Sequence, residues 1–207
     1  MFSFSSRLYP ITDRQTSGLS HAEQVERLSA GGARLIQLRE KNLAPGEFYR
    51  EAEAALRVAR SRGVLIIIND RVDIAFALRA DGVHLGQDDL PPEAARRVLG
   101  HGAVIGFSTH NAQQAQRAAT MPVDYIAIGP ICATVTKVKP DPVVGLNELR
   151  RIRNLLGPIP LVAIGGITAE NAVEITSAGA DAVALVSALL RPSSSIEART
   201  QELLALL

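Results

Sequence analysis

Eight short aliphatic runs, distributed along the whole chain, constrain the fold more than any other feature of the sequence. Each run is rich in Val, Ile and Leu, ends at a polar or glycine-containing junction, and is followed by a longer Ala-rich segment. The runs comprise residues 8–12, 34–38, 64–68, 82–85, 103–107, 125–128, 161–164 and 182–186. Aliphatic runs of this length between turn residues predict strands buried on both faces, as in a parallel sheet.

The segments between the runs have the composition of helices. They are rich in Ala, Leu, Glu, Arg and Gln, with apolar residues three and four positions apart. We predict helices over residues 22–30, 45–61, 70–80, 91–99, 112–119, 146–155, 169–177 and 193–207. This alternation indicates an α/β fold of the (β/α)₈ or TIM-barrel type, with an open doubly wound sheet as the alternative.

Length, charge and cysteine content exclude several classes of protein. A chain of 207 residues suits one domain over residues 1–207, and its net charge of +1 provides no general attraction for nucleic acid or membrane. Cys132 is the only cysteine, so no intrachain disulfide can form. Residues 1–7 lack a basic stretch followed by an apolar run, so we expect no secretory signal and a cytoplasmic protein.

Polar side chains gather at the predicted carboxyl ends of the strands, where barrel enzymes place their active sites. They include Gln37, Arg39, Glu40, Lys41, Asn69, Asp70, His84, Asp88, Asp89, Ser108, His110, Thr134, Thr136, Lys137 and Ser187. Charged and hydroxyl groups are costly to bring near a core unless something satisfies them. Their position therefore predicts a polar ligand at this end of the barrel.

Asp70 and Asp89 follow neighbouring strands and supply hard oxygen ligands. Such a pair can hold Mg²⁺, which commonly bridges protein carboxylates and substrate phosphates. The alternative is structural: Asp70 would cap the next helix, and Asp89 would be a solvated neighbour of Asp88.

Two further groups indicate phosphate chemistry. Arg39, Lys41 and Lys137 could neutralise a diphosphate leaving group, although most Lys and Arg side chains are simply solvated. Residues 165–166 and 186–187 follow the last two strands, where barrels often bind phosphate through backbone N–H groups, although Gly-Gly is more commonly a turn. Together these features suggest a reaction between two phosphorylated small molecules.

Six sequence blocks, in this order, carry a family resemblance. They are Leu-Tyr-Pro-Ile-Thr-Asp at 8–13, Gln-Leu-Arg-Glu-Lys at 37–41, Ile-Asn-Asp-Arg-Val-Asp at 68–73, Gly-Val-His-Leu-Gly-Gln-Asp-Asp-Leu at 82–90, Ser-Thr-His-Asn at 108–111 and Ala-Ile-Gly-Gly-Ile at 163–167. Along nearly its whole length the chain resembles the thiamine phosphate synthases, also called thiamine-phosphate pyrophosphorylases. The resemblance favours the barrel and implies a transferase that joins a pyrimidine methyl diphosphate to a thiazole phosphate.

The resemblance also implies roles for the matching positions. One Mg²⁺ would be held by Asp70 and Asp89, and the implied catalytic residues are Arg39, Lys41, Ser108 and Lys137. The implied substrate-binding residues are Gln37, Leu38, Arg39, Glu40, Lys41, Asn69, Ser108, Thr134, Val135, Thr136, Lys137, Gly166, Val186 and Ser187. The implied mechanism is dissociative: diphosphate leaves, and the thiazole nitrogen attacks a pyrimidine methyl cation. Such catalysis depends on positioning and electrostatic stabilisation rather than on a protein nucleophile.

The sequence departs from the family pattern at Cys132 and Ala133, where an aromatic residue and a proline are expected. We expect altered loop packing there rather than lost activity. A related barrel, thiazole tautomerase, uses a histidine at the position of His110, and a non-catalytic binding protein could keep the phosphate loops. The diphosphate-binding cations and the aspartate pair favour the synthase.

The remaining titratable residues receive structural interpretations. We expect His84 to be a hydrogen-bonded barrel residue, His21 and His101 to lie at the surface, and Arg71 to pair with Asp73 at a helix start. The predicted partners are the two phosphorylated substrates, and a compact barrel could form a homo-oligomer through its outer helices.

Overall fold

The strands of the computed structural model, which describes residues 2–134 and 141–207, close into a barrel. They are β1 Leu8–Thr12, β2 Leu35–Leu38, β3 Leu65–Asn69, β4 Gly82–Leu85, β5 Val104–Thr109, β6 Tyr125–Ile128, β7 Leu161–Ile164 and β8 Ala182–Leu185. Each strand pairs in parallel with the next, and β8 returns to β1, with Val183 opposite Leu8. The predicted (β/α)₈ barrel is confirmed, and the open sheet is excluded.

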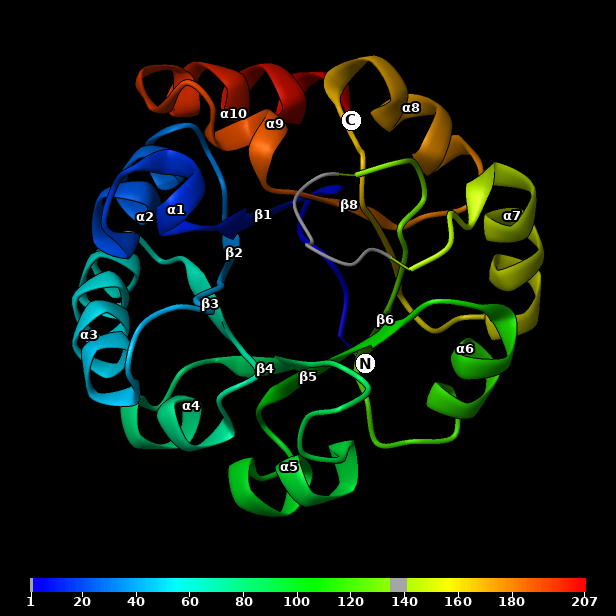
Figure 1. The fold of residues 1–207 in the computed structure, drawn as a ribbon, viewed down its shortest axis with the longest axis horizontal. Helices are drawn as coiled ribbons and strands as arrows, with labels where there is room; N and C mark the ends of the chain where they lie inside the picture. Colours follow the sequence, from blue (N-terminus) through cyan, green and yellow to red (C-terminus); the bar gives the residue numbers. More distant parts are fainter. Residues whose placement is uncertain (1, 135–140) are drawn as a thin grey trace.

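A ring of helices surrounds the strands (Figure 1). They are α1 Arg14–Ser17, α2 His21–Ala30, α3 Pro45–Ser61, α4 Val72–Leu78, α5 Pro92–Leu99, α6 Ala112–Ala118, α7 Gly145–Leu156, α8 Ala169–Ser177, α9 Ser187–Leu190 and α10 Ile196–Leu206, with a 3₁₀ turn η1 at Ser193–Ser195. The sequence did not predict α1 and α9, because four residues are too few for a helical repeat to show. Within residues 2–134 and 141–207, no helix combines the length and apolarity needed to cross a membrane.

Strand β3 illustrates how the aliphatic runs build the core. Ile66 and Ile68 point outward and join the apolar layer under the helices, whereas Ile67 points inward and packs inside the barrel. All three side chains are completely buried. Burial of one such side chain contributes roughly 1.5–3 kcal/mol, so a strand with two apolar faces is stable only between two packed layers.

Aromatic rings close the amino end of the barrel. Phe2 and Phe4 precede β1 and pack against Tyr9 and Tyr125, with ring centroids 5.7 Å apart for Phe4–Tyr9 and 5.4 Å apart for Phe4–Tyr125. The N-terminal segment accordingly lies inside the ring of strands in Figure 1. We call Phe2, Phe4, Tyr9 and Tyr125 the aromatic floor. It leaves the carboxyl end as the place where polar groups can meet a ligand.

Candidate active site

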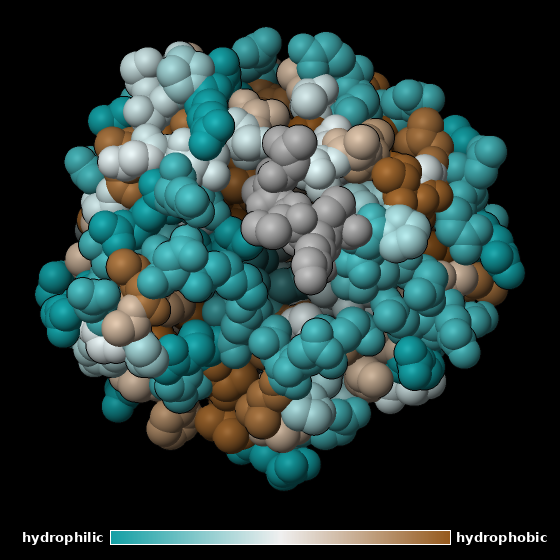
Figure 2. Space-filling view, viewed as in Figure 1, coloured by the Kyte–Doolittle hydropathy of each residue, from teal (hydrophilic) through white to brown (hydrophobic). Residues whose placement is uncertain are grey.

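The carboxyl ends of the strands face the viewer in Figures 1 and 2, because residues 129–134 and 141–144, which follow β6, lie at the front. Hydrophilic side chains predominate on this face to the left of its centre and below it (Figure 2). The predicted site residues follow or end the strands that open here. We call this opening the mouth of the barrel.

Two of the predicted cations are held by carboxylates at the mouth. Arg39 follows β2, and its Nη1 donates to Oδ2 of Asp13 at 2.5 Å. Asp13 also begins α1, because its Oδ1 accepts a hydrogen bond from the backbone N–H of Thr16 at 2.8 Å. The Nζ of Lys41 pairs with Oδ2 of Asp70. Both cations are therefore oriented before any ligand is bound.

Asp70 has the backbone geometry of a constrained site residue. Its φ of 62° lies in the left-handed region, which few residues with a side chain adopt, although Asp tolerates it better than most. Such strain persists where surrounding structure imposes it, most often at functional sites. The alternative role as a helix cap does not occur, because Arg71 occupies the N-cap of α4 and no side chain caps that helix.

Asp89 lies next to Asp70 and completes a pair of carboxylates. Its Oδ2 accepts a hydrogen bond from the backbone N–H of Gly86 at 2.7 Å. Burial raises the pKa of Asp89, and the adjacent Asp70 raises this pKa further. A divalent cation would relieve this repulsion. The described residues contain no cluster of three or more His, Cys, Asp or Glu side chains that could hold a metal ion. A Mg²⁺ ion at this pair would therefore need water or phosphate oxygens to complete its coordination.

Buried polar groups lie beneath the charged residues. Gln37 donates from Nε2 to the hydroxyl of Tyr9 at 3.2 Å. His84 contacts the Tyr125 hydroxyl through Nδ1 at 2.9 Å and the Ser108 hydroxyl through Nε2 at 2.8 Å. Burial lowers the pKa of His84 to about 4, so its imidazole is neutral near pH 7. The interpretation of His84 as a hydrogen-bonded barrel residue is confirmed.

On the opposite side of the mouth, glycine backbone replaces charged side chains. Gly165 and Gly166 follow β7 with φ of 95° and 67°, in the region that favours glycine. A Cβ on Gly166 would lie 2.4 Å from the carbonyl oxygen of Ala133, so the segment after β6 packs directly on this turn. The side chain of Asn171 in α8 holds the turn by donating to the carbonyl of Gly166 at 3.0 Å.

Val186 and Ser187 lie beside the glycine turn, because β8 neighbours β7 in the barrel. Val186 is the N-cap of α9, and Ser187 is the first residue of that short helix. A short extra helix after the last strand is a recurrent phosphate-binding element of this fold. The mouth thus combines charged side chains on the β2–β4 side with backbone groups on the β7–β8 side.

A family model described as thiamine monophosphate synthase matches residues 8–189. The chain belongs to this family. It is 43% identical over 201 residues to the thiamine-phosphate synthase of Chloroflexus aurantiacus, covering 97% of this chain and 92% of the relative. It is 45% identical over 186 residues to the thiamine-phosphate synthase of Clostridium novyi, covering 89% of this chain and 91% of the relative.

Solved structures agree with the family assignment. The thiamine phosphate pyrophosphorylase of Pyrococcus furiosus superposes with a TM-score of 0.86 at 35% identity, covering 97% of this chain and 94% of that one. More distant barrels share only the fold: a (S)-3-O-geranylgeranylglyceryl phosphate synthase from Thermoplasma acidophilum reaches a TM-score of 0.65 at 16% identity, covering 98% of this chain and 93% of that one. The predicted family is therefore confirmed.

Three of the predicted substrate-binding residues have side chains that are buried or engaged with their own loop, which limits how they can contact a ligand. Leu38 is completely buried in the outer apolar layer, so only its backbone can reach a ligand. The Glu40 carboxylate turns back to its own loop, where Oε1 accepts from the N–H groups of Lys41 at 2.9 Å and Asn42 at 2.8 Å. Asn69 ends β3 and is buried beneath the mouth.

The segment after β6 is described only in part. Thr134 is half-buried at the end of the described stretch. The predicted site residues Val135, Thr136 and Lys137 lie outside the described residues.

One prediction about the histidines was wrong. His21 is completely buried rather than at the surface, and its Nδ1 is 2.7 Å from the hydroxyl of Thr12. Its Nε2 faces the Glu40 carboxylate at 3.5 Å, and burial lowers the pKa of His21. His21 begins α2, and its side chain points toward the strands, where it supports the loop that carries Arg39 and Lys41. His101 is exposed, as predicted.

Sequence reasoning also missed the partners of the site residues. Asp13 and Tyr9 contact the predicted site residues Arg39 and Gln37, and Tyr125 contacts Tyr9, yet none of the three was singled out for chemistry. The only available signal was the Asp at the end of the first strand, which reads equally well as a helix cap. The predicted ion pair of Arg71 and Asp73 is present at the start of α4.

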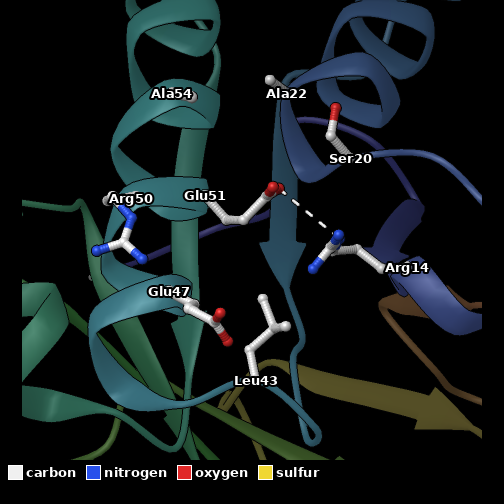
Figure 3. A pocket seen from close by; sticks show the side chains of 8 residues that line it. All are labelled: Arg14, Ser20, Ala22, Leu43, Glu47, Arg50, Glu51 and Ala54. Atoms are coloured by element: carbon white, nitrogen blue, oxygen red, sulfur yellow. Dashed lines mark ion pairs between the residues drawn. The ribbon is translucent and has the colours of Figure 1, made fainter.

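A concavity of about 380 Å³ lies outside the barrel, between α1, α2 and α3 (Figure 3). An ion pair spans it, with Nε of Arg14 3.9 Å from Oε2 of Glu51. Its lining residues are Arg14, Ser20, Ala22, Leu43, Glu47, Arg50, Glu51 and Ala54. None of them is a predicted site residue, so this groove is separate from the mouth.

Proposed function

We propose that this protein condenses 4-amino-2-methyl-5-(diphosphooxymethyl)pyrimidine with (carboxy)thiazole phosphate, releasing diphosphate and forming thiamine phosphate. The observation that carries the proposal is the pairing of two differently built anion sites across one mouth. Charged side chains on the β2–β4 side suit a departing diphosphate, and glycine backbone on the β7–β8 side suits a phosphate that stays bound. Membership of the thiamine monophosphate synthase family supports the same activity.

Departure of diphosphate would be assisted by Arg39 and Lys41. The C–O bond between the pyrimidine methyl group and diphosphate breaks, and both electrons leave with the oxygen. Arg39 and Lys41 would exchange Asp13 and Asp70 for diphosphate oxygens, so the charge that develops meets oriented donors. Lys137 would join them, although it lies outside the described residues.

We further propose that Asp70 and Asp89 hold one Mg²⁺ against the diphosphate. The bound ion would supply charge neutralisation at the leaving-group oxygens. The two carboxylates meet this role because they are adjacent and mutually repelling, and because Asp70 is held in a strained conformation. When Asp70 takes up this role, Lys41 becomes available to the diphosphate.

Formation of the new bond would depend on positioning. Gln37, Asn69 and Ser108 would orient the aminopyrimidine above the aromatic floor, while Gly166 and the backbone at 186–187 hold the thiazole phosphate. The thiazole nitrogen attacks the pyrimidine methyl cation and forms the C–N bond, and a carboxylated thiazole then loses CO₂. No step requires a protein nucleophile, because binding places the two reactants together.

The decisive experiment measures diphosphate release and thiamine phosphate formation from both substrates, with Mg²⁺ present or chelated. The test variant is Asp70→Asn, and its matched control is Asp73→Asn, an exposed aspartate that forms an ion pair with Arg71. We expect product formation that requires Mg²⁺, a loss of about 100-fold or more in Asp70→Asn, and near-normal activity in Asp73→Asn.

The same assay tests the tautomerase alternative. His110 would then move protons on the thiazole without pyrimidine, yet its Nδ1 already contacts the carbonyl of Gly129 at 2.7 Å. Isomerisation of the thiazole alone, without diphosphate release, would overturn the proposed function. A cytoplasmic location and pairing of copies through the outer helices remain predictions; fractionation and sedimentation measurements test them.

A further inference from the structure

A continuous chain of polar side chains crosses the interior of the barrel beneath the mouth. It runs from Gln37 through Tyr9, Tyr125 and His84 to Ser108, with successive contacts of 3.2, 2.9, 2.9 and 2.8 Å. These residues come from five different strands, β2, β1, β6, β4 and β5. Only Ser108 is half-buried, and the other four are buried. We call this set the hydrogen-bond chain.

The number of available protons determines which group donates and which accepts in the first half of the hydrogen-bond chain. Gln37 contacts Tyr9 through Nε2, which can only donate, so the Tyr9 oxygen accepts. The single hydroxyl proton of Tyr9 then has the Tyr125 oxygen as its partner. The opposite arrangement would leave the buried hydroxyl proton of Tyr9 without an acceptor among the described residues, which is costly. Tyr9 therefore donates to Tyr125.

The same counting fixes the second half. Tyr125 accepts from Tyr9, and its own proton points to Nδ1 of His84. A neutral imidazole has one donor and one acceptor nitrogen, so an accepting Nδ1 places the proton of His84 on Nε2. This N–H donates to the hydroxyl oxygen of Ser108. The proton of Ser108 is consequently directed away from His84.

We propose that Tyr9, Tyr125 and His84 are positioning residues that hold the Ser108 hydroxyl as a hydrogen-bond donor toward the substrate. This inference rests on the proposed function, in which Ser108 contacts the pyrimidine substrate. Ring nitrogens and diphosphate oxygens are both acceptors, so a fixed donor at Ser108 matches that substrate. A freely rotating serine would spend part of its time as an acceptor and would repel the same atoms.

The surrounding structure protects the hydrogen-bond chain from water and from ionisation. Phe2 and Phe4 cover Tyr9 and Tyr125 on the side away from the mouth. Burial raises the pKa of both tyrosines, so each keeps its hydroxyl proton. Gly106 gives the phenol room, because a Cβ at that position would lie 2.1 Å from Cζ of Tyr125.

Nuclear magnetic resonance of ¹⁵N-histidine-labelled protein tests the direction without any substrate. The signals of His84 are identified by their absence in His84→Gln. We expect the wild-type protein to have the proton on Nε2, and Tyr125→Phe to lose this preference because Nδ1 no longer receives a proton. A proton on Nδ1 in the wild type, or an unchanged tautomer in Tyr125→Phe, would overturn the proposal. This result stands whether or not the protein condenses the two substrates.

Kinetics test whether the direction matters to catalysis. We expect Tyr125→Phe to lower kcat about tenfold, the factor that corresponds to one ordinary hydrogen bond, with little change in KM for the thiazole phosphate. The matched control is Tyr49→Phe, in α3 outside the barrel, which should change neither constant. If the hydrogen-bond chain acts through Ser108, Tyr125→Phe should add nothing in a Ser108→Ala background. Full additivity of the two losses, or an unchanged kcat in Tyr125→Phe, would show a merely structural role.

Discussion

The two sides of the mouth recognise anions by different physical means. On the charged side, defined by Arg39, Lys41, Asp70 and Asp89, oriented side chains are already satisfied by one another or by backbone groups. On the glycine side, defined by residues 165–166 and 186–187, the backbone itself forms the surface.

Because of this difference, changes on the charged side should affect activity more than stability, whereas changes on the glycine side should affect both. A charged side chain can exchange one partner for another while the backbone stays in place. Partly exposed ion pairs also contribute little to stability, typically 0–1 kcal/mol, so the fold survives their loss. A glycine turn with positive φ belongs to the fold itself, so any change there disturbs binding and stability together. The predictions below test this separation, from the largest expected effect to the smallest.

Removal of one cation should give the largest loss of activity. We expect Lys41→Ala to lower kcat by about 10²–10³-fold, because a preorganised donor to the leaving group is lost from a half-exposed ion pair. The free energy of unfolding should change by roughly 1 kcal/mol or less. Steady-state kinetics and thermal denaturation check this, with Arg71→Ala as the control. A selective increase in KM for the thiazole phosphate would contradict the division into two sides.

Lowering the pH should reduce the free energy of unfolding, because His84 is buried beneath the charged side. The pKa of His84 is lowered to about 4 in the folded protein, below the value of about 6.5 in the unfolded chain. The unfolded chain therefore binds a proton first, and the stabilising contribution is lost as the pH falls from about 6.5 toward 4. We expect a loss of about 3 kcal/mol over this window. Denaturant unfolding at several pH values checks it: His84→Gln should reduce the dependence, leaving the contribution of His21, whose pKa burial also lowers, whereas His101→Gln should leave it unchanged.

Gly166→Ala should affect binding and folding together. The substitution adds a side chain at a φ of 67° and brings Cβ to 2.4 Å from the Ala133 carbonyl. We expect KM for the thiazole phosphate to rise about tenfold and the free energy of unfolding to fall by roughly 1–3 kcal/mol. Gly18→Ala is the control, because Gly18 has a φ of 73° but nothing within 4 Å of its Cβ position. Equal effects in both variants would assign the loss to backbone strain alone.

Asn171→Ala should give the smallest effect. It removes the hydrogen bond to the Gly166 carbonyl and another, of 2.9 Å, from the Thr168 N–H to Oδ1. We expect KM for the thiazole phosphate to rise severalfold and the free energy of unfolding to fall by roughly 1–2 kcal/mol, as for two ordinary hydrogen bonds. Isothermal titration with the thiazole phosphate checks this. A larger effect on kcat than on KM would show that Asn171 contributes to the chemical step and not only to phosphate binding.

The alternation of strands and helices was predicted from local pattern, whereas the choice of a barrel over an open sheet depended on the family resemblance. Aliphatic runs specify strands, and Asp70 directly follows β3, whereas Asp89 lies in the loop after β4. The helix α9 was not predicted, although Ser187 was expected to bind phosphate. Four residues leave no repeat to detect, so the phosphate prediction depended on the order of the strands rather than on a helix signal.

The partners of the site residues could not be predicted, because the sequence does not show which polar atoms of a buried residue will contact one another. Tyr9 and Tyr125 lie in strands and read as ordinary core, yet each also places a hydroxyl inside the barrel. His21 follows a helix cap and reads as a surface residue of a first turn. Its rotation toward Thr12 depends on how α2 packs against the strands, which no local pattern records.

The aromatic floor closes the amino end of the barrel, so the mouth is the end through which ligands can reach its interior. Phe2 and Phe4 occupy the amino end, so both substrates must enter, and all products must leave, through the mouth. Because substrates and products share this end, a product that is still bound at the mouth prevents the next substrate from binding. Added diphosphate should therefore compete with the pyrimidine substrate for the mouth.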